Sequence, residues 1–168
     1  MRTDLTVVPL AVLLLAAGSW DVARRKVPNA FPSALFLAGL VAQTATGGWR
    51  AAGFALAAAL GLGAVLTLAW SARFIGGGDV KLGTAAAVAV GWPRLSMYLL
   101  ATALAGGLVA LACYAASAPA ARARVRAGLA LAVRGVALAS PEPTAATVRV
   151  PYASAMAVGA LIALFWGG

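Results

Sequence analysis

Long runs of apolar residues recur along this chain, and they constrain its fold more than any other feature. Of its 168 residues, 63% are hydrophobic and 10% are charged, and the mean hydropathy is +0.95. Several runs approach the roughly 20 residues that a helix needs to cross a bilayer. A soluble core of this size would not carry so many of them. The sequence therefore predicts an all-α, polytopic membrane protein.

About six membrane-spanning helices are expected, over residues 5–20, 30–46, 51–72, 80–91, 95–116 and 151–166. The fourth is short, because about a dozen residues cannot cross a hydrocarbon core of roughly 30 Å unaided. Either neighbouring helices shield it, or the membrane is thinner around it. Residues 117–150 form an arginine-rich cytoplasmic loop. A shared helical face there predicts an amphipathic helix on the membrane surface, formed by Val125, Leu129, Val133 and Val136.

The basic residues predict the orientation. With the N-terminus outside, ten of them fall on the cytoplasmic side, while Arg2, Arg50 and Arg94 fall outside. The net charge of +9 then reflects orientation and anionic lipid headgroups, and no nucleic-acid partner is needed. Residues 16–19 resemble a signal-peptide cleavage region, but the basic cluster at 24–26 favours a retained helix. The cytoplasmic set is Arg24, Arg25, Lys26, Arg73, Lys81, Arg122, Arg124, Arg126, Arg134 and Arg149.

Only four residues are acidic, and two of them, Asp21 and Asp79, lie where apolar runs break. A membrane protein seldom keeps a carboxylate near hydrocarbon unless it has a function. The predicted topology places both at the cytoplasmic boundary. Histidine is absent, so carboxylates are the obvious groups for proton transfer. The single cysteine, Cys113, excludes a disulfide framework and a cysteine-based zinc site, and no metal or cofactor is predicted.

The neighbours of each aspartate allow two interpretations. Three glycines at 76–78 precede Asp79, and glycine tolerates positive φ and lets another backbone approach, which suits a site that admits an extended peptide. Alternatively, Asp79 is an ordinary helix N-cap after loop glycines. A phosphate-binding loop is disfavoured, because the spacing fits neither the Walker nor the dinucleotide-binding pattern and Asp79 would repel a phosphate. Asp21 could likewise end a helix and simply pair with Arg24 or Arg25.

Three short stretches of the sequence, taken in order, form a recognisable pattern. They are Asp21 with Arg24 and Val27-Pro28-Asn29, then Gly76-Gly77-Gly78-Asp79-Val80-Lys81-Leu82, and finally Val150-Pro151-Tyr152-Ala153. The second is similar to the GxGD signature of certain intramembrane aspartyl proteases. In this order, the chain resembles the type IV prepilin peptidases, in particular their short Tad/Flp-type members.

The resemblance implies a single integral-membrane peptidase domain over residues 1–168, in the bacterial inner (cytoplasmic) membrane. It implies that Asp21 and Asp79 form a catalytic pair near the cytoplasmic face and remove the short basic leader from prepilins and pseudopilins. Longer members carry a tetracysteine zinc-binding insertion and also N-methylate the trimmed pilin. This chain lacks those cysteines, which puts methyltransferase activity in doubt. Its last motif also departs from the family pattern, with Ala153 where a glycine is common.

Electrostatics supports a catalytic pair independently of the resemblance. Two carboxylates about 4 Å apart repel by roughly 4 kcal/mol at an effective dielectric near 20, which can keep one of them protonated. We expect the ionised acid to take a proton from water as it attacks the scissile carbonyl. The protonated acid donates to the carbonyl oxygen. Which aspartate has which role is not predicted, because coupled groups titrate as a pair.

Further residues are expected to bind substrate or support the site: Gly76, Gly77, Gly78, Lys81, Arg24, Pro28, Asn29, Pro151 and Tyr152. Ordinary explanations also exist. Lys81 could extend to lipid headgroups, and Pro28 and Asn29 could form a turn and a helix cap. Pro151 suits a helix start and Tyr152 a membrane interface.

Two other functions stay open from sequence alone. One is a small transporter or channel that uses the two aspartates as a proton or cation site. The other is a noncatalytic pilus-assembly scaffold with the same fold. A transporter predicts acids near mid-membrane and inverted repeats, whereas both aspartates here lie near the boundary and the two halves of the chain do not match.

Overall fold

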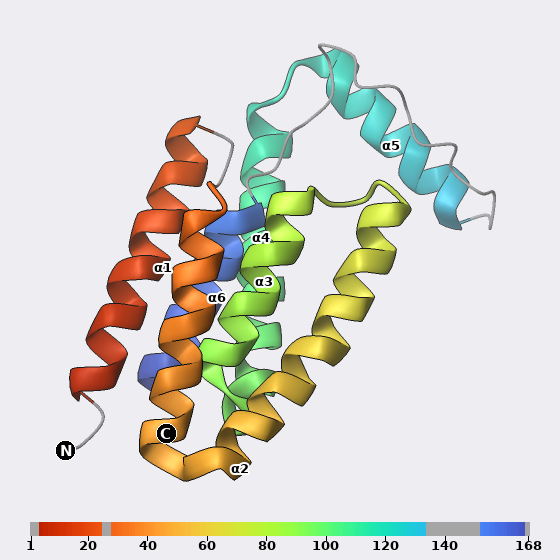
Figure 1. Cartoon of the computed structure of the whole chain (residues 1–168). Coiled ribbons are helices and arrows are strands. Elements are labelled where there is room, and N and C mark those ends of the chain that lie inside the picture. The colour runs from red at the N-terminus through yellow and green to blue at the C-terminus, as the bar shows by residue number, and fades with distance from the viewer. Residues whose placement is uncertain (1–3, 25–27, 134–151, 167–168) are drawn as a thin grey trace. The chain divides into compact units, whose positions relative to one another are not determined.

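Helices make up every regular element in the described part of the chain. The computed structural model describes residues 4–24, 28–133 and 152–166, and the predicted all-α class is confirmed there. The elements are α1 (Asp4–Arg24), α2 (Ala30–Ser71), α3 (Gly77–Val90), the 3₁₀ turn η1 (Trp92–Arg94), α4 (Leu95–Ala116), α5 (Pro119–Val133) and α6 (Tyr152–Trp166) (Figure 1).

The chain divides into two compact units. The first combines Met1–Gly106 with Pro151–Gly168, and the second is Gly107–Val150. Both aspartates at the boundaries of apolar runs belong to the first unit. The assignment of residues 1–168 to one domain stays a prediction.

Among the described residues, three helical stretches are long and apolar enough to cross a membrane. They are Thr6–Arg24, Ala30–Ser71 and Trp92–Ala116. The apolar helix α6 has 15 residues and is shorter than a full crossing. The protein is therefore a helical membrane protein, while the six-span arrangement and the orientation stay predictions.

The long helix α2 is broken near its middle. Its 42 residues would measure about 63 Å as a straight helix, roughly twice the hydrocarbon core of a bilayer. Gly48 interrupts it with φ 70° and ψ −168°, a backbone conformation that is essentially restricted to glycine. Figure 1 shows the two halves of α2 diverging from this bend. The break falls between the two spans that were predicted at 30–46 and 51–72.

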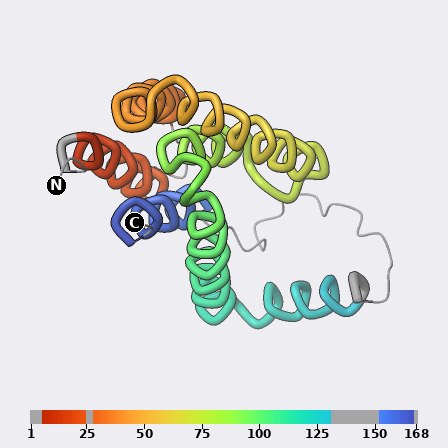
Figure 2. Tube along the Cα trace, turned by 90° about the horizontal axis from the view of Figure 1, so that it is seen from below, coloured from red at the N-terminus to blue at the C-terminus, as the bar shows by residue number. Residues whose placement is uncertain are grey.

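Helix α3 forms the centre of the first unit. Eight of its 14 residues are buried, and it packs between α2 and α6 (Figure 2). The approach of α2 is close, because a Cβ on Gly39 would lie 2.7 Å from the Ala89 Cα. At about 21 Å, α3 is shorter than a bilayer core. Neighbouring helices shield it, which is one of the two possibilities that the sequence left open for so short a span.

A side chain from α2 completes the buried end of α3. The Gln43 Nε2 donates a hydrogen bond of 3.1 Å to the Ala89 carbonyl. The last carbonyls of a helix have no intrahelical donor, and in a membrane they need another partner. Gly91 then turns the chain with φ 78° and leaves room for the Gln43 amide. Gln43 thus allows a short helix to end among apolar neighbours.

The second unit contains a helix in the region where the sequence predicts an amphipathic segment. Helix α5 occupies Pro119–Val133, and its Val125 and Leu129 side chains are exposed. The Arg126 Nε donates a hydrogen bond of 2.9 Å to the Tyr114 hydroxyl. A helix in the predicted region is confirmed. Its place on the membrane surface stays a prediction, and Val136 lies outside the described residues.

Candidate active site

Asp21 lies on the buried face of α1. Leu10, Leu14, Ala17 and Asp21 follow one another at helical spacing and are all buried, with Asp21 only 7% exposed. The carboxylate therefore continues an apolar stripe into the interior. It also sits three residues before the end of α1, where the helix dipole is negative and disfavours an anion. Such a group requires stabilisation from another element.

The first turn of α6 supplies that stabilisation. The Ser154 amide donates a hydrogen bond of 3.3 Å to the Asp21 Oδ2, and the Ala153 amide donates to the Asp79 carboxylate. Amides in the first turn of a helix have no intrahelical acceptor, and they lie at the positive end of the helix dipole. One helix N-terminus thus holds both carboxylates.

Asp79 is the third residue of α3. Its Oδ2 accepts a hydrogen bond of 3.1 Å from the Gly76 amide, and Gly76 occupies the N-cap position. The sequence alternative that made Asp79 itself the N-cap is wrong by three positions, although Asp79 does stabilise the start of the helix. The side chain is half-buried, and the Asp21 charge acts on it. The structure therefore brings the two aspartates together.

The glycines before Asp79 act through their missing side chains. Among the described glycines, positive φ occurs at Gly48 and Gly91, so the conformational freedom expected at 76–78 is not used. A Cβ on Gly76 would lie 3.1 Å from the Asp79 Oδ2, and one on Gly77 would lie 3.5 Å from the Trp70 indole. A Cβ on Gly78 would meet nothing within 4 Å. Space is therefore open beside the first turn of α3.

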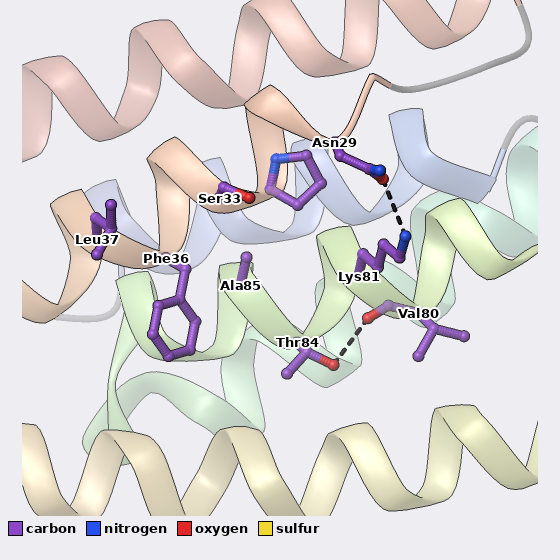
Figure 3. A pocket seen from close by; sticks show the side chains of 9 residues that line it. Asn29, Ser33, Phe36, Leu37, Val80, Lys81, Thr84 and Ala85 are labelled. Atoms are coloured by element: carbon purple, nitrogen blue, oxygen red, sulfur yellow. Dashed lines mark hydrogen bonds between the residues drawn. The ribbon is translucent and has the colours of Figure 1, made fainter.

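Lys81 and Asn29 contact each other at the edge of the site. The Lys81 Nζ donates a hydrogen bond of 3.0 Å to the Asn29 Oδ1 (Figure 3). Asn29 is at the N-cap position of α2, as predicted, but its side chain makes no capping bond. Its backbone is helical, with φ −58° and ψ −21°, whereas a capping residue is usually extended. The pair joins α2 to α3 beside a groove of about 660 Å³.

The other predicted supporting residues that the structure describes make contacts of their own or begin a helix. The Arg24 guanidinium lies 5.2 Å from the centroid of the Trp20 ring, a cation–π contact. The Pro28 carbonyl accepts a hydrogen bond from the Phe31 amide in the turn before α2. Tyr152 is the first residue of α6 and is exposed. Pro151 lies outside the described residues.

Sequence reasoning missed the groups that connect the two acids. It expected Pro151 and Tyr152 to line the site, but the donors are the backbone amides of the next two residues, Ala153 and Ser154. The available signal was a proline directly before the last apolar run, which marks a helix start with free amides. Within the described residues, no group of three or more histidine, cysteine, aspartate or glutamate side chains could hold a metal.

A comparison with known proteins identifies a family for this chain. The model of the type IV leader peptidase family matches residues 8–111, a range that contains Asp21 and Asp79 and ends before α6. No curated protein and no solved structure matches the chain. The match covers more than half of the sequence and confirms the family resemblance. The chain therefore belongs to the type IV leader peptidase family.

Proposed function

We propose that this protein is a short, Tad/Flp-type member of its family and a membrane-embedded aspartic endopeptidase. It removes the short basic leader from type IV or Flp-type prepilins and pseudopilins at the cytoplasmic face of the bacterial inner membrane. One observation carries the proposal: the carboxylates from α1 and α3 lie near enough for their charges to interact, and the amino end of α6 donates a hydrogen bond to each. Family membership makes peptide hydrolysis the reaction that such a pair serves.

The proposed reaction uses the two acids without a covalent intermediate. The ionised carboxylate accepts a proton from water while the water oxygen attacks the scissile carbonyl carbon. The protonated carboxylic acid donates its proton to the carbonyl oxygen. The C–N bond of the resulting tetrahedral intermediate then breaks: the acid that took the proton from water gives it to the leaving amine, and a hydroxyl of the intermediate returns a proton to the other carboxylate, which restores the pair. The amides of Ala153 and Ser154 stabilise the negative charge that the pair keeps throughout.

The surroundings of the pair suit a peptide and a lipid surface. The open space beside Gly78 leaves room for an extended substrate at the first turn of α3. Arg122, Arg124 and Arg126 on α5 can contact anionic lipid headgroups. Substrate prepilins, pseudopilins and anionic lipids are thus the proposed partners, and the basic charge requires no nucleic acid.

Cleavage of a prepilin in lipid nanodiscs tests the proposal. Wild-type protein should release the leader, and Asp21→Asn and Asp79→Asn should each lower the rate by about 10²–10⁴-fold, because each removes a group that transfers a proton. Asp4→Asn is the matched control, since it makes the same change at the first residue of α1 and should cleave normally.

Two results would contradict the proposed peptidase function. The first is that the wild-type protein leaves the leader intact. If it nevertheless binds prepilin, a noncatalytic scaffold would be favoured. The other is an Asp21→Asn or Asp79→Asn variant that cleaves at the wild-type rate. Ion flux in proteoliposomes that depends on the same two aspartates would instead favour a transporter.

A further inference from the structure

Helix α6 approaches α1 closely at one position, Gly18. A Cβ on Gly18 would lie 3.1 Å from the Ala157 Cβ and 3.8 Å from the Ser154 Cα. Ordinary contacts between carbon atoms are roughly 3.5–4.0 Å long, so an alanine here would force the two helices apart by a few tenths of an ångström. Gly18 itself is buried, and it precedes Asp21 by one helical turn, on the same side of α1.

The hydrogen bond next to this contact has little tolerance for such a shift. The Ser154 amide lies 3.3 Å from the Asp21 Oδ2, already beyond the usual 2.7–3.2 Å for a bond of this kind. A displacement of a few tenths of an ångström would take the donor out of hydrogen-bonding range. The Asp21 carboxylate would then remain at the unfavourable end of α1 without this donor from α6.

We propose that Gly18 is a positioning residue of the active site. Its missing side chain lets α6 come close enough to α1 for the Ser154 amide to reach Asp21. The expected effect on cleavage rests on the proposed peptidase function. The expected effect on the position of α6 rests on geometry alone. Gly18 touches neither substrate nor reacting atoms, and it acts through the position of α6.

A single added methyl group tests the role. Gly18→Ala should lower kcat for prepilin cleavage by about tenfold, because a weakened hydrogen bond to a charged group is worth a factor of this size. KM should stay within about twofold of wild type, because the open space beside Gly78 is unaltered. Gly61→Ala is the matched control, since a Cβ there meets nothing within 4 Å, and it should leave kcat unchanged.

Removal of the opposing methyl group should restore the enzyme. In Gly18→Ala with Ala157→Gly, the close Cβ–Cβ contact disappears, while the second contact at 3.8 Å is an ordinary one. The double variant should therefore recover most of the lost kcat. It also gains a glycine within α6, which lowers helix stability. Recovery of kcat despite that penalty separates positioning from a general effect on folding.

Amide hydrogen exchange gives a measurement that needs no catalysis. In the full-length protein in nanodiscs, the Ser154 amide should exchange several-fold faster in Gly18→Ala than in wild type, and the double variant should reverse the change. Unchanged exchange in Gly18→Ala, or an unrestored double variant, would overturn the proposal. If the wild-type protein cleaves no prepilin, the peptidase fails, while the exchange data still decide whether Gly18 positions α6.

Discussion

At the scale of single residues, the site places a carboxyl group where an anion is unfavourable. Asp21 is almost fully buried and lies in the last turn of α1. Burial penalises the ionised carboxylate, and so does the negative end of the helix dipole. The Ser154 amide offsets part of this cost. Such an arrangement is expected where function, not stability, selects the residue.

This conflict predicts that Asp21→Asn stabilises the protein while it slows cleavage. The asparagine carbonyl oxygen still accepts the Ser154 amide, and the unfavourable charge is gone. The free energy of unfolding should rise by about 0.5–1 kcal/mol, visible as a higher midpoint of thermal unfolding in detergent. Asp4→Asn, at the opposite end of the helix, should give no gain. A lower midpoint for Asp21→Asn would mean that the charged hydrogen bond outweighs both penalties.

Sequence alone identified the two acids but not the groups that hold them. Asp21 and Asp79 are conspicuous because carboxylates are rare in an apolar chain. The amides of Ala153 and Ser154 have no such signature, since every residue except proline carries one. The sequence does not mark Gly18 as important either, because the distance between two helices depends on how they pack and not on either helix alone.

At the scale of elements, apolar runs predicted the helices well and their endings less well. The bounds of α4 agree with the run at 95–116, and the break of α2 at Gly48 falls where two spans were separated. The sequence of α3 does not show how this helix can end among buried residues. The Ala89 carbonyl in its last turn depends on Gln43, which is distant in the chain, and periodicity within one helix contains no information on such a partner.

Replacement of that partner should destabilise α3 without removing a catalytic group. Gln43→Leu keeps a similar volume but leaves the Ala89 carbonyl without its donor. An unsatisfied buried acceptor costs about 1–3 kcal/mol, so the midpoint of thermal unfolding should fall by several degrees. Thr44→Val, at the neighbouring exposed position, is the control and should change the midpoint little. An unchanged midpoint for Gln43→Leu would show that another donor satisfies this end of α3.

At the scale of the whole molecule, the meeting of the two acids follows from the path of the chain. Asp21 is near the end of α1 and Asp79 near the start of α3, and only α2 and two segments of a few residues each separate these helices along the chain. The halves of α2 on either side of Gly48 measure about 27 Å and 34 Å, each close to one bilayer crossing. Two crossings return the chain to the face from which it left. The predicted topology therefore places the acids on one face in either orientation.

Cysteine labelling from the two sides of the membrane tests this path and the predicted orientation together. Trp49 lies beside the bend of α2 and Phe74 beyond its far end, and their side chains are 77% and 72% exposed. With Cys113 replaced by serine, Trp49→Cys should react with an impermeant maleimide added to intact spheroplasts. Phe74→Cys should react only after permeabilisation, because the predicted topology places it with the basic residues inside. The reverse pattern would put the acid pair on the outer face, where a cytoplasmic leader could not reach it. Reaction of both variants from one side would mean that α2 does not cross the membrane in two halves.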